Sequence, residues 1–73
     1  MKVCHNSSKL NRLLNKTVRI EFINGQVLTG VLMDRLGAID KTNYNFLMMP
    51  YYLIGYGEIF GFYKSHVVRI SEV

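Results

Sequence analysis

The sequence predicts an all-β fold: a small, strongly bent barrel of five strands preceded by one short helix. Three observations predict it. Apolar and polar residues alternate in short runs, an Asn24-Gly25 pair separates the first two runs, and Gly30 interrupts the second run. Asn and Gly tolerate the positive φ angles of a tight two-residue hairpin turn. A glycine inside a strand is typical of a sharp bend, which lets one long strand serve both halves of a barrel.

A chain of 73 residues is long enough for one domain with a small hydrophobic core. Such cores usually need a disulfide, a metal or oligomerisation. Cys4 is the only cysteine and His5 and His66 are the only histidines, so one chain cannot form an internal disulfide or a zinc-type ligand set. Hydrophobic residues make up 49% of the chain, which indicates that some apolar surface is an interface. We therefore expect an oligomer that needs no metal or other cofactor.

Positive charge gathers near the N-terminus of a chain whose formal net charge is +4. The first nineteen positions hold no acidic residue and five basic ones: Lys2, Lys9, Arg12, Lys16 and Arg19. A basic face attracts polyanions such as nucleic acid, although a solvated helix face is the alternative interpretation. No apolar run is as long as a membrane span and no signal-peptide core is present, so we expect a soluble, cytoplasmic protein with no membrane partner.

The first elements follow from spacing and alternation. Residues 1–8 are polar and expected to be frayed. Leucines at positions 10, 13 and 14 then predict a helix over residues 9–15, and residues 17–73 form the barrel. This helix is too short to persist alone, so we expect it across the open end of the barrel. The first strand is predicted over residues 17–23, with Val18, Ile20 and Phe22 facing inward.

The second strand is predicted from Gln26 to about Arg35. Both of its faces are apolar, so it is buried on both sides or bends through its middle. Residues 36–43 mix a glycine and a charge pair with turn-forming residues, and a loop is expected there. A third strand is predicted over residues 44–49, where Pro50 ends it.

The C-terminal part of the chain is rich in aromatic residues. Six of the nine aromatic residues lie between Tyr51 and Tyr63. We expect residues 51–57 to be a loop or a strand extension and residues 58–63 to be a fourth strand. After a short turn, residues 67–71 are predicted to form the fifth strand.

Five short strands after one helix, with a bent second strand, describe an SH3-like small barrel, and two motifs in it resemble those of the Sm and Sm-like proteins. The first is Val18-x-Ile20-x-Phe22-Ile23-Asn24-Gly25-x-x-Leu28-x-Gly30-x-Leu32. The second, Tyr63-Lys64-Ser65-His66-Val67-Val68-Arg69-Ile70, is similar to the motif of the bacterial Hfq branch. Leu10-Asn11-x-Leu13 resembles the helix before the first strand in that branch. The resemblance covers most of the chain outside about residues 34–58.

The resemblance implies a ring of about five to seven identical subunits, in which the fourth strand of one subunit pairs with the fifth strand of the next. Such pairing closes exposed sheet edges and buries surplus apolar surface. The expected interface residues are Tyr56, Phe60, Phe62, Tyr63, Val67, Val68 and Ile70.

The resemblance also implies that the ring binds single-stranded RNA near its pore, in RNA metabolism or regulation. The loop before the third strand and the turn before the fifth would hold the bases. Aromatic rings stack on unpaired bases, and amides and cations contact base edges and phosphates. The residues at matching positions are Asp40, Asn43, Tyr44, Asn45, Lys64, Ser65 and His66.

Within this set the expected roles differ. Tyr44 is the expected stacking residue, Asn43 or Asn45 the base-edge reader, and Lys64 the phosphate or base contact. Asp40 takes the place of the family's aspartate if the loop carries an insertion, because Leu36 occupies that place without one.

Other interpretations of the same residues remain open. Tyr44 also suits a core or interface position, Lys64 a solvated turn, and Asp40 a charge that balances Lys41. The chain has no nucleophile with a neighbouring base and no phosphate-binding glycine loop, so we do not expect an enzyme. The competing function is an SH3-like structural or protein-interaction module, such as a ring scaffold without RNA binding. The basic N-terminal face favours RNA, whereas the aromatic and methionine-rich second half favours protein contact.

Overall fold

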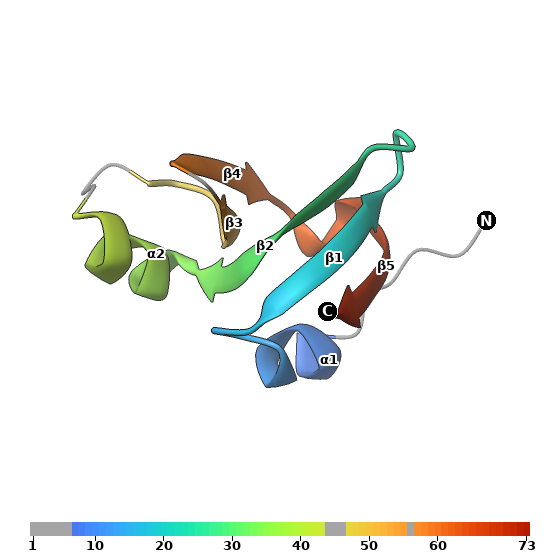
Figure 1. The fold of residues 1–73 in the computed structure, drawn as a ribbon. Helices are drawn as coiled ribbons and strands as arrows, with labels where there is room; N and C mark the ends of the chain where they lie inside the picture. Colours follow the sequence, from blue (N-terminus) through green and yellow to red (C-terminus); the bar gives the residue numbers. More distant parts are fainter. Residues whose placement is uncertain (1–6, 44–46, 56) are drawn as a thin grey trace.

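The computed structural model describes residues 7–43, 47–55 and 57–73, and a single antiparallel sheet of five strands forms its centre (Figure 1). The strands are β1 (Thr17–Phe22), β2 (Val27–Asp34), β3 (Tyr51–Gly55), β4 (Glu58–Phe62) and β5 (Val67–Glu72). The helical elements are α1 (Ser7–Arg12), α2 (Arg35–Thr42) and one 3₁₀ turn, η1 (Lys64–His66). The predicted mostly β fold with a short helix is confirmed.

The strands lie in the order β4-β3-β2-β1-β5, so β4 and β5 form the two edges of the sheet. Each neighbouring pair is antiparallel. In the part of the chain that the structure describes, the two edge strands do not pair with each other, and the sheet is open rather than closed into a barrel. The same part of the chain contains no helix of the length and apolar character needed to cross a membrane.

The β1–β2 hairpin follows the predicted alternation, but its turn differs from the predicted one. Val18, Ile20 and Phe22 are buried as expected. Gly25 has a positive φ of 87°, and its N–H donates to the Phe22 carbonyl at 2.9 Å, whereas the φ of Asn24 is not positive. This geometry matches a three-residue loop with glycine in the left-handed position, not the two-residue turn that the Asn-Gly pair suggested.

Strand β2 serves two neighbours, as the position of Gly30 suggested. Residues 27–31 pair with β1 and residues 31–34 pair with β3. A Cβ atom on Gly30 would lie 3.0 Å from the Ile54 carbonyl oxygen of β3, so the close approach of the two backbones favours glycine here.

Both faces of β2 are apolar because each face meets a different hydrophobic cluster. The main core lies on the face that carries Leu32, and its buried members are Leu10, Val18, Ile20, Phe22, Leu32, Leu53, Phe62, Val67 and Ile70. A second cluster on the opposite face contains Met33, Ala38 and Tyr52. Residues of α2 and of the segment before β3 cover this second cluster.

Helix α1 packs on the main core beneath β1 and β5 (Figure 1). Leu10 is fully buried, and the two leucines that follow it pack against the same cluster. The helix begins and ends earlier than the predicted range 9–15. Asn15 takes a left-handed conformation with a φ of 69°, and its N–H donates to the Leu32 carbonyl at 2.7 Å. This contact turns the chain into β1 before the helix can continue.

The expected loop over residues 36–43 is wrong, because these residues belong to helix α2 and its C-terminal cap. The Asp34 carboxylate accepts a hydrogen bond from the Gly37 N–H at 2.7 Å, which is an N-cap contact. Ala38 is fully buried against the second cluster. Asn43, with a φ of 62°, ends the helix in the left-handed conformation. The stabilisation from burying Ala38 and from a cap at each end therefore outweighs the low helix propensity of Gly37.

The third strand lies later in the chain than residues 44–49, so that prediction is also wrong. Residues 47–50 are not in a strand, and residues 44–46 lie outside the described part of the chain. The Met49 N–H donates to the Tyr52 hydroxyl at 2.7 Å instead of to a strand ladder. Residues 51–55 form β3 because they pair with β2 on one side and β4 on the other. Of the two expectations for this segment, strand and loop, the strand is correct.

Candidate nucleic-acid interface

The turn between β4 and β5 holds the Tyr63–His66 part of the second motif. Its single 3₁₀ turn is closed by a hydrogen bond from the His66 N–H to the Tyr63 carbonyl at 3.0 Å. The Ile23 N–H donates to the His66 carbonyl at 2.9 Å, which ties the turn to the end of β1. The backbone is thus fixed, while the side chains of Lys64, Ser65 and His66 remain exposed.

Tyr63 lies at the start of this turn with half of its surface exposed. Its ring meets the His66 ring edge to face, with centroids 5.9 Å apart and planes at 83°. Edge-to-face packing of this kind restrains both rings without covering the outer face of either. The turn therefore presents an aromatic ring and a cation next to each other.

The sheet register brings the start of α2 to the same end of the molecule as this turn. Asp34, the last residue of β2, pairs with Tyr51, and Tyr51 pairs with Phe62, the last residue of β4. These three residues form one row across the sheet, so the ends of β2 and β4 are about 10 Å apart, or two strand spacings. The chain enters α2 from one end of the row and the Tyr63 turn from the other.

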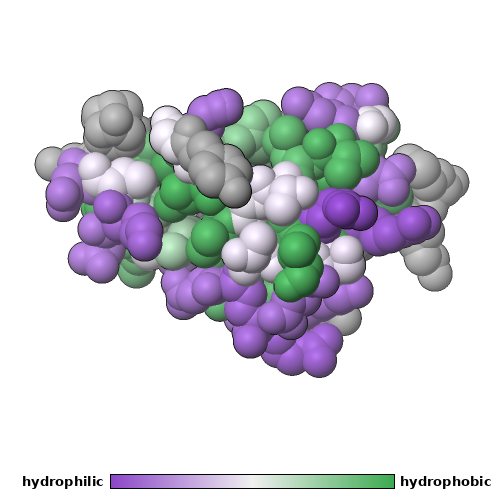
Figure 2. Space-filling view, viewed as in Figure 1, coloured by the Kyte–Doolittle hydropathy of each residue, from purple (hydrophilic) through white to green (hydrophobic). Residues whose placement is uncertain are grey.

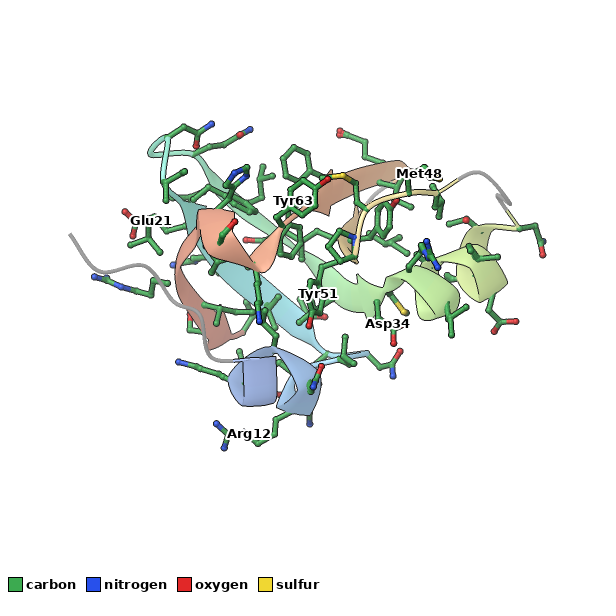
Figure 3. All side chains as sticks on the ribbon, turned by 180° about the vertical axis from the view of Figure 1, so that it is seen from behind. Arg12, Glu21, Asp34, Met48, Tyr51 and Tyr63 are labelled. Atoms are coloured by element: carbon green, nitrogen blue, oxygen red, sulfur yellow. The ribbon has the colours of Figure 1, made fainter. Side chains whose placement is uncertain are left out.

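A surface depression of about 480 Å³ lies where these segments meet. Its lining comes from the start of α2, the segment before β3 and the end of β4: Asp34, Arg35, Leu36, Met48, Pro50 and Tyr63. Figure 3 labels Asp34, Met48 and Tyr63 around this part of the molecule, with Arg12 far from them on α1. Leu36 and Met48 are 73% and 78% exposed, which is high for large apolar side chains. The arrangement offers flat apolar and aromatic surface beside one cation and one anion.

The structure brings some of the predicted RNA-contacting residues together and leaves others apart. Lys64, Ser65 and His66 share one exposed turn beside the depression. Asp40 and Asn43 are exposed in the second half of α2 and at its C-cap, and Asp40 lies about 9 Å further along the helix axis than Asp34. Tyr44 and Asn45 lie outside the described residues.

The predicted interface residues divide between the core and the surface. Phe62, Val67 and Ile70 are buried inside the subunit as members of the main core. Phe60 and Tyr63 are 39% and 50% exposed, and Val68 is half-buried. Tyr56 lies outside the described residues. Among the described residues no strand pairs with the outer edge of β4 or of β5, and Phe60 is the side chain on β4 that exposes the most apolar surface.

The residues that sequence reasoning missed are Asp34, Arg35, Leu36 and Met48. Asp34 carried a usable signal, because an aspartate at the end of a strand and three residues before the N–H that it caps, here that of Gly37, is a typical helix start. Leu36 and Met48 carried none, since apolar residues in a segment of unknown conformation are assigned to the core by default.

Positive charge also gathers on α1, away from the depression. A second depression lies between α1 and β5, and its lining includes Lys9, Arg12 and Lys16. Figure 2 shows hydrophilic residues over α1 and exposed apolar residues over β2. Lys16 forms an ion pair with Glu72 at 3.9 Å, but both side chains are about half exposed, so the pair contributes little stability. Among the described residues, no group of three histidine, cysteine or acidic side chains is placed to hold a metal ion.

No family model matches the chain, and neither a curated protein nor a solved structure shows significant similarity to it.

Proposed function

We propose that this chain is an Sm-like protein that assembles as a homo-oligomeric ring and binds single-stranded RNA near the pore. The observation that carries the proposal is the place of the second motif. Its first residues form a fixed, exposed turn that joins the two edge strands and lies beside the β2–β3 connection. The use of β2 by both halves of the open sheet supports an Sm-like arrangement of the strands.

Ring assembly is supported by the two edges of the sheet, which have no partner strand within the described part of the chain. Strand β4 has five residues and β5 has six, so one edge can pair with the other along nearly its whole length. Pairing β4 of one subunit with β5 of the next is a head-to-tail contact, which closes into a ring when the rotation per subunit divides a full turn. It would satisfy the free backbone groups on both edges and cover the exposed part of Phe60.

RNA binding is supported by the chemistry of the turn. The half-exposed ring of Tyr63 suits stacking on an unpaired base, and Lys64 supplies a cation for a phosphate or a base edge. Ser65 and His66 add hydrogen-bonding groups on the same turn. In a ring, each subunit would place one such turn near the axis, so a single strand would meet the same contacts repeatedly.

Lys64→Ala is expected to weaken binding of short uridine-rich and adenine-rich RNA by about tenfold, the loss typical of one charge-assisted contact. The slope of log K against the logarithm of the salt concentration should also become about one unit less steep, because one phosphate contact is removed. Fluorescence anisotropy at two or more salt concentrations measures both effects.

Lys41→Ala is the matched control, since Lys41 is an exposed lysine of α2 outside the depression. It should leave RNA affinity nearly unchanged. Equal affinities for the parent and Lys64→Ala, or no binding by the parent at low salt, would contradict RNA binding at the turn.

A ring scaffold that binds protein rather than RNA is the second candidate. The exposed apolar side chains Leu36 and Met48 favour it, because such groups also suit protein contact. The outcome that would select it is a stable ring that fails to bind any RNA oligomer at low salt.

A further inference from the structure

The depression between α2 and Tyr63 has a lining that matches one nucleobase better than the others. We propose that it is a guanine pocket, which selects guanine within the single-stranded RNA that the proposed function assigns to this end of the molecule. The inference rests on that proposed function and adds a base preference to it. Three features of the lining carry it: apolar walls, a carboxylate with acceptor capacity, and a neighbouring guanidinium.

The walls suit a flat, mostly apolar ring. Leu36 and Met48 expose most of their side chains into solvent in the depression that the half-exposed Tyr63 ring also lines, and Pro50 adds a rigid surface to the same lining. Within α2, Ala38 points into the second cluster whereas Leu36 remains uncovered. A purine offers more stacking area to these groups than a pyrimidine does, and base stacking on an aromatic side chain contributes about 1–3 kcal/mol.

The Asp34 carboxylate favours a base that presents two adjacent donors. One carboxylate oxygen, Oδ1, accepts the Gly37 N–H at 2.7 Å, but a carboxylate has about four acceptor sites in all. Guanine carries N1–H and N2–H₂ side by side on its Watson–Crick edge. Adenine and cytosine carry one amino group next to an acceptor, and uracil carries one N–H between two carbonyl groups. Guanine is therefore the one base whose Watson–Crick edge can donate two hydrogen bonds to the carboxylate without also placing an acceptor atom against a carboxylate oxygen.

Arg35 favours the same base from its other edge. A guanidinium donates well to the paired acceptors O6 and N7, which only guanine has. Asp34 and Arg35 are consecutive residues that line the same depression. Asp34 can thus accept hydrogen bonds from the Watson–Crick edge of a guanine, and Arg35 can donate hydrogen bonds to its Hoogsteen edge.

The test compares hexamers of uridine that contain one central guanine, adenine or inosine. The guanine hexamer should bind the parent about tenfold more tightly than the adenine hexamer. The inosine hexamer should lose most of that gain, since inosine lacks the N2 amino group. Parent binding that depends on salt but not on the central base would overturn the guanine pocket and leave the proposed function standing.

Asp34→Asn separates recognition from folding, because asparagine is as good an N-cap as aspartate. This variant should keep its thermal stability and its affinity for plain uridine hexamers while it loses most of its preference for guanine over adenine, and only the contribution of Arg35 remains. Glu21→Gln makes the same chemical change on β1, away from the depression, and should keep the full preference. A guanine preference that is undiminished in Asp34→Asn would overturn the role of the carboxylate.

Titration with free 5′-GMP and 5′-AMP, followed by the backbone amide shifts of residues 34–36 and 63, distinguishes RNA from a free nucleotide as the source of the guanine. Weak, saturable shifts with 5′-GMP and none with 5′-AMP are expected. If 5′-GMP binds while no RNA oligomer does, the pocket stands as a nucleotide site and the RNA function fails. If neither binds, both proposals fail.

Discussion

Replacing Phe62 with alanine is expected to lower the free energy of unfolding by about 3–5 kcal/mol, the usual cost of truncating a buried phenylalanine. Phe62 is 2% exposed in the main core. Its ring packs edge to face on Phe22 with centroids 5.3 Å apart and stacks on Tyr51 at 5.9 Å. Small domains have a total stability of about 5–15 kcal/mol, so the variant should be largely unfolded well below the melting temperature of the parent.

Phe60→Ala is the matched control, because Phe60 lies on the same strand and also contacts Phe22, at 5.5 Å, but is 39% exposed. Within one chain, less apolar surface leaves water when this ring is buried, so its truncation should cost clearly less. Urea unfolding measures both variants at one fixed protein concentration, low enough for the chain to be a monomer, so that the proposed β4–β5 contact over Phe60 does not enter the comparison. A loss for Phe62→Ala that is no larger than the loss for Phe60→Ala would contradict the described core.

Gly30→Ala is expected to destabilise the fold by about 1–3 kcal/mol, although alanine normally suits a strand at least as well as glycine. The added Cβ would lie 3.0 Å from the Ile54 carbonyl oxygen and 3.3 Å from its carbonyl carbon. These atoms belong to the backbone of β3, so relief requires β2 and β3 to move apart at the point where β2 changes partners. Thermal or urea unfolding monitored by circular dichroism measures the loss.

Gly55→Ala provides the comparison for this prediction. A Cβ at that position would meet the Thr29 carbonyl at 3.7 Å, an ordinary van der Waals contact, and the φ of Gly55 is not positive. Alanine there restricts the unfolded chain without straining the folded one, so we expect an unchanged or slightly raised stability. If both glycine variants behave alike, the close approach at Gly30 does not determine the bend of β2.

The first and last strands could be predicted from the sequence because their patterns are local. Val18, Ile20 and Phe22 alternate with polar residues and are all buried. Gly30 was interpreted as a bend that lets one strand serve two neighbours, and β2 does change partners at Val31, the next residue. In these regions the side-chain period, the turn residues and the tertiary packing all favour the same structure.

The β2–β3 connection could not be predicted in the same way, because its structure depends on distant partners. Ala38 stabilises α2 by packing on Met33 and Tyr52, and Tyr52 is brought there by pairing with β2. The glycine and charges in this segment favour a loop when read alone. The Asp34 cap was the local signal for a helix, but the sequence-based interpretation placed Asp34 in the second strand and did not use that signal.

For the candidate site, sequence reasoning predicted the turn between β4 and β5 but missed the start of α2. The turn that carries Lys64, Ser65 and His66 was predicted from the second motif and is an exposed, hydrogen-bonded turn. Asp34, Arg35 and Leu36 were missed, because their place beside Tyr63 follows from the pairing row of Asp34, Tyr51 and Phe62. That row became visible only once β3 was placed at residues 51–55.

The mass of the native assembly tests the central proposal most directly, because both the edge pairing and the repeated RNA contacts require neighbouring subunits. Native mass spectrometry on the 8.5 kDa chain, repeated after adding a short uridine-rich RNA, gives the subunit number and the bound strand together. We expect one closed species of about five to seven subunits whose mass does not change with concentration, with one RNA strand bound per ring. A monomer at tens of micromolar, or an open-ended ladder of masses, would contradict the ring.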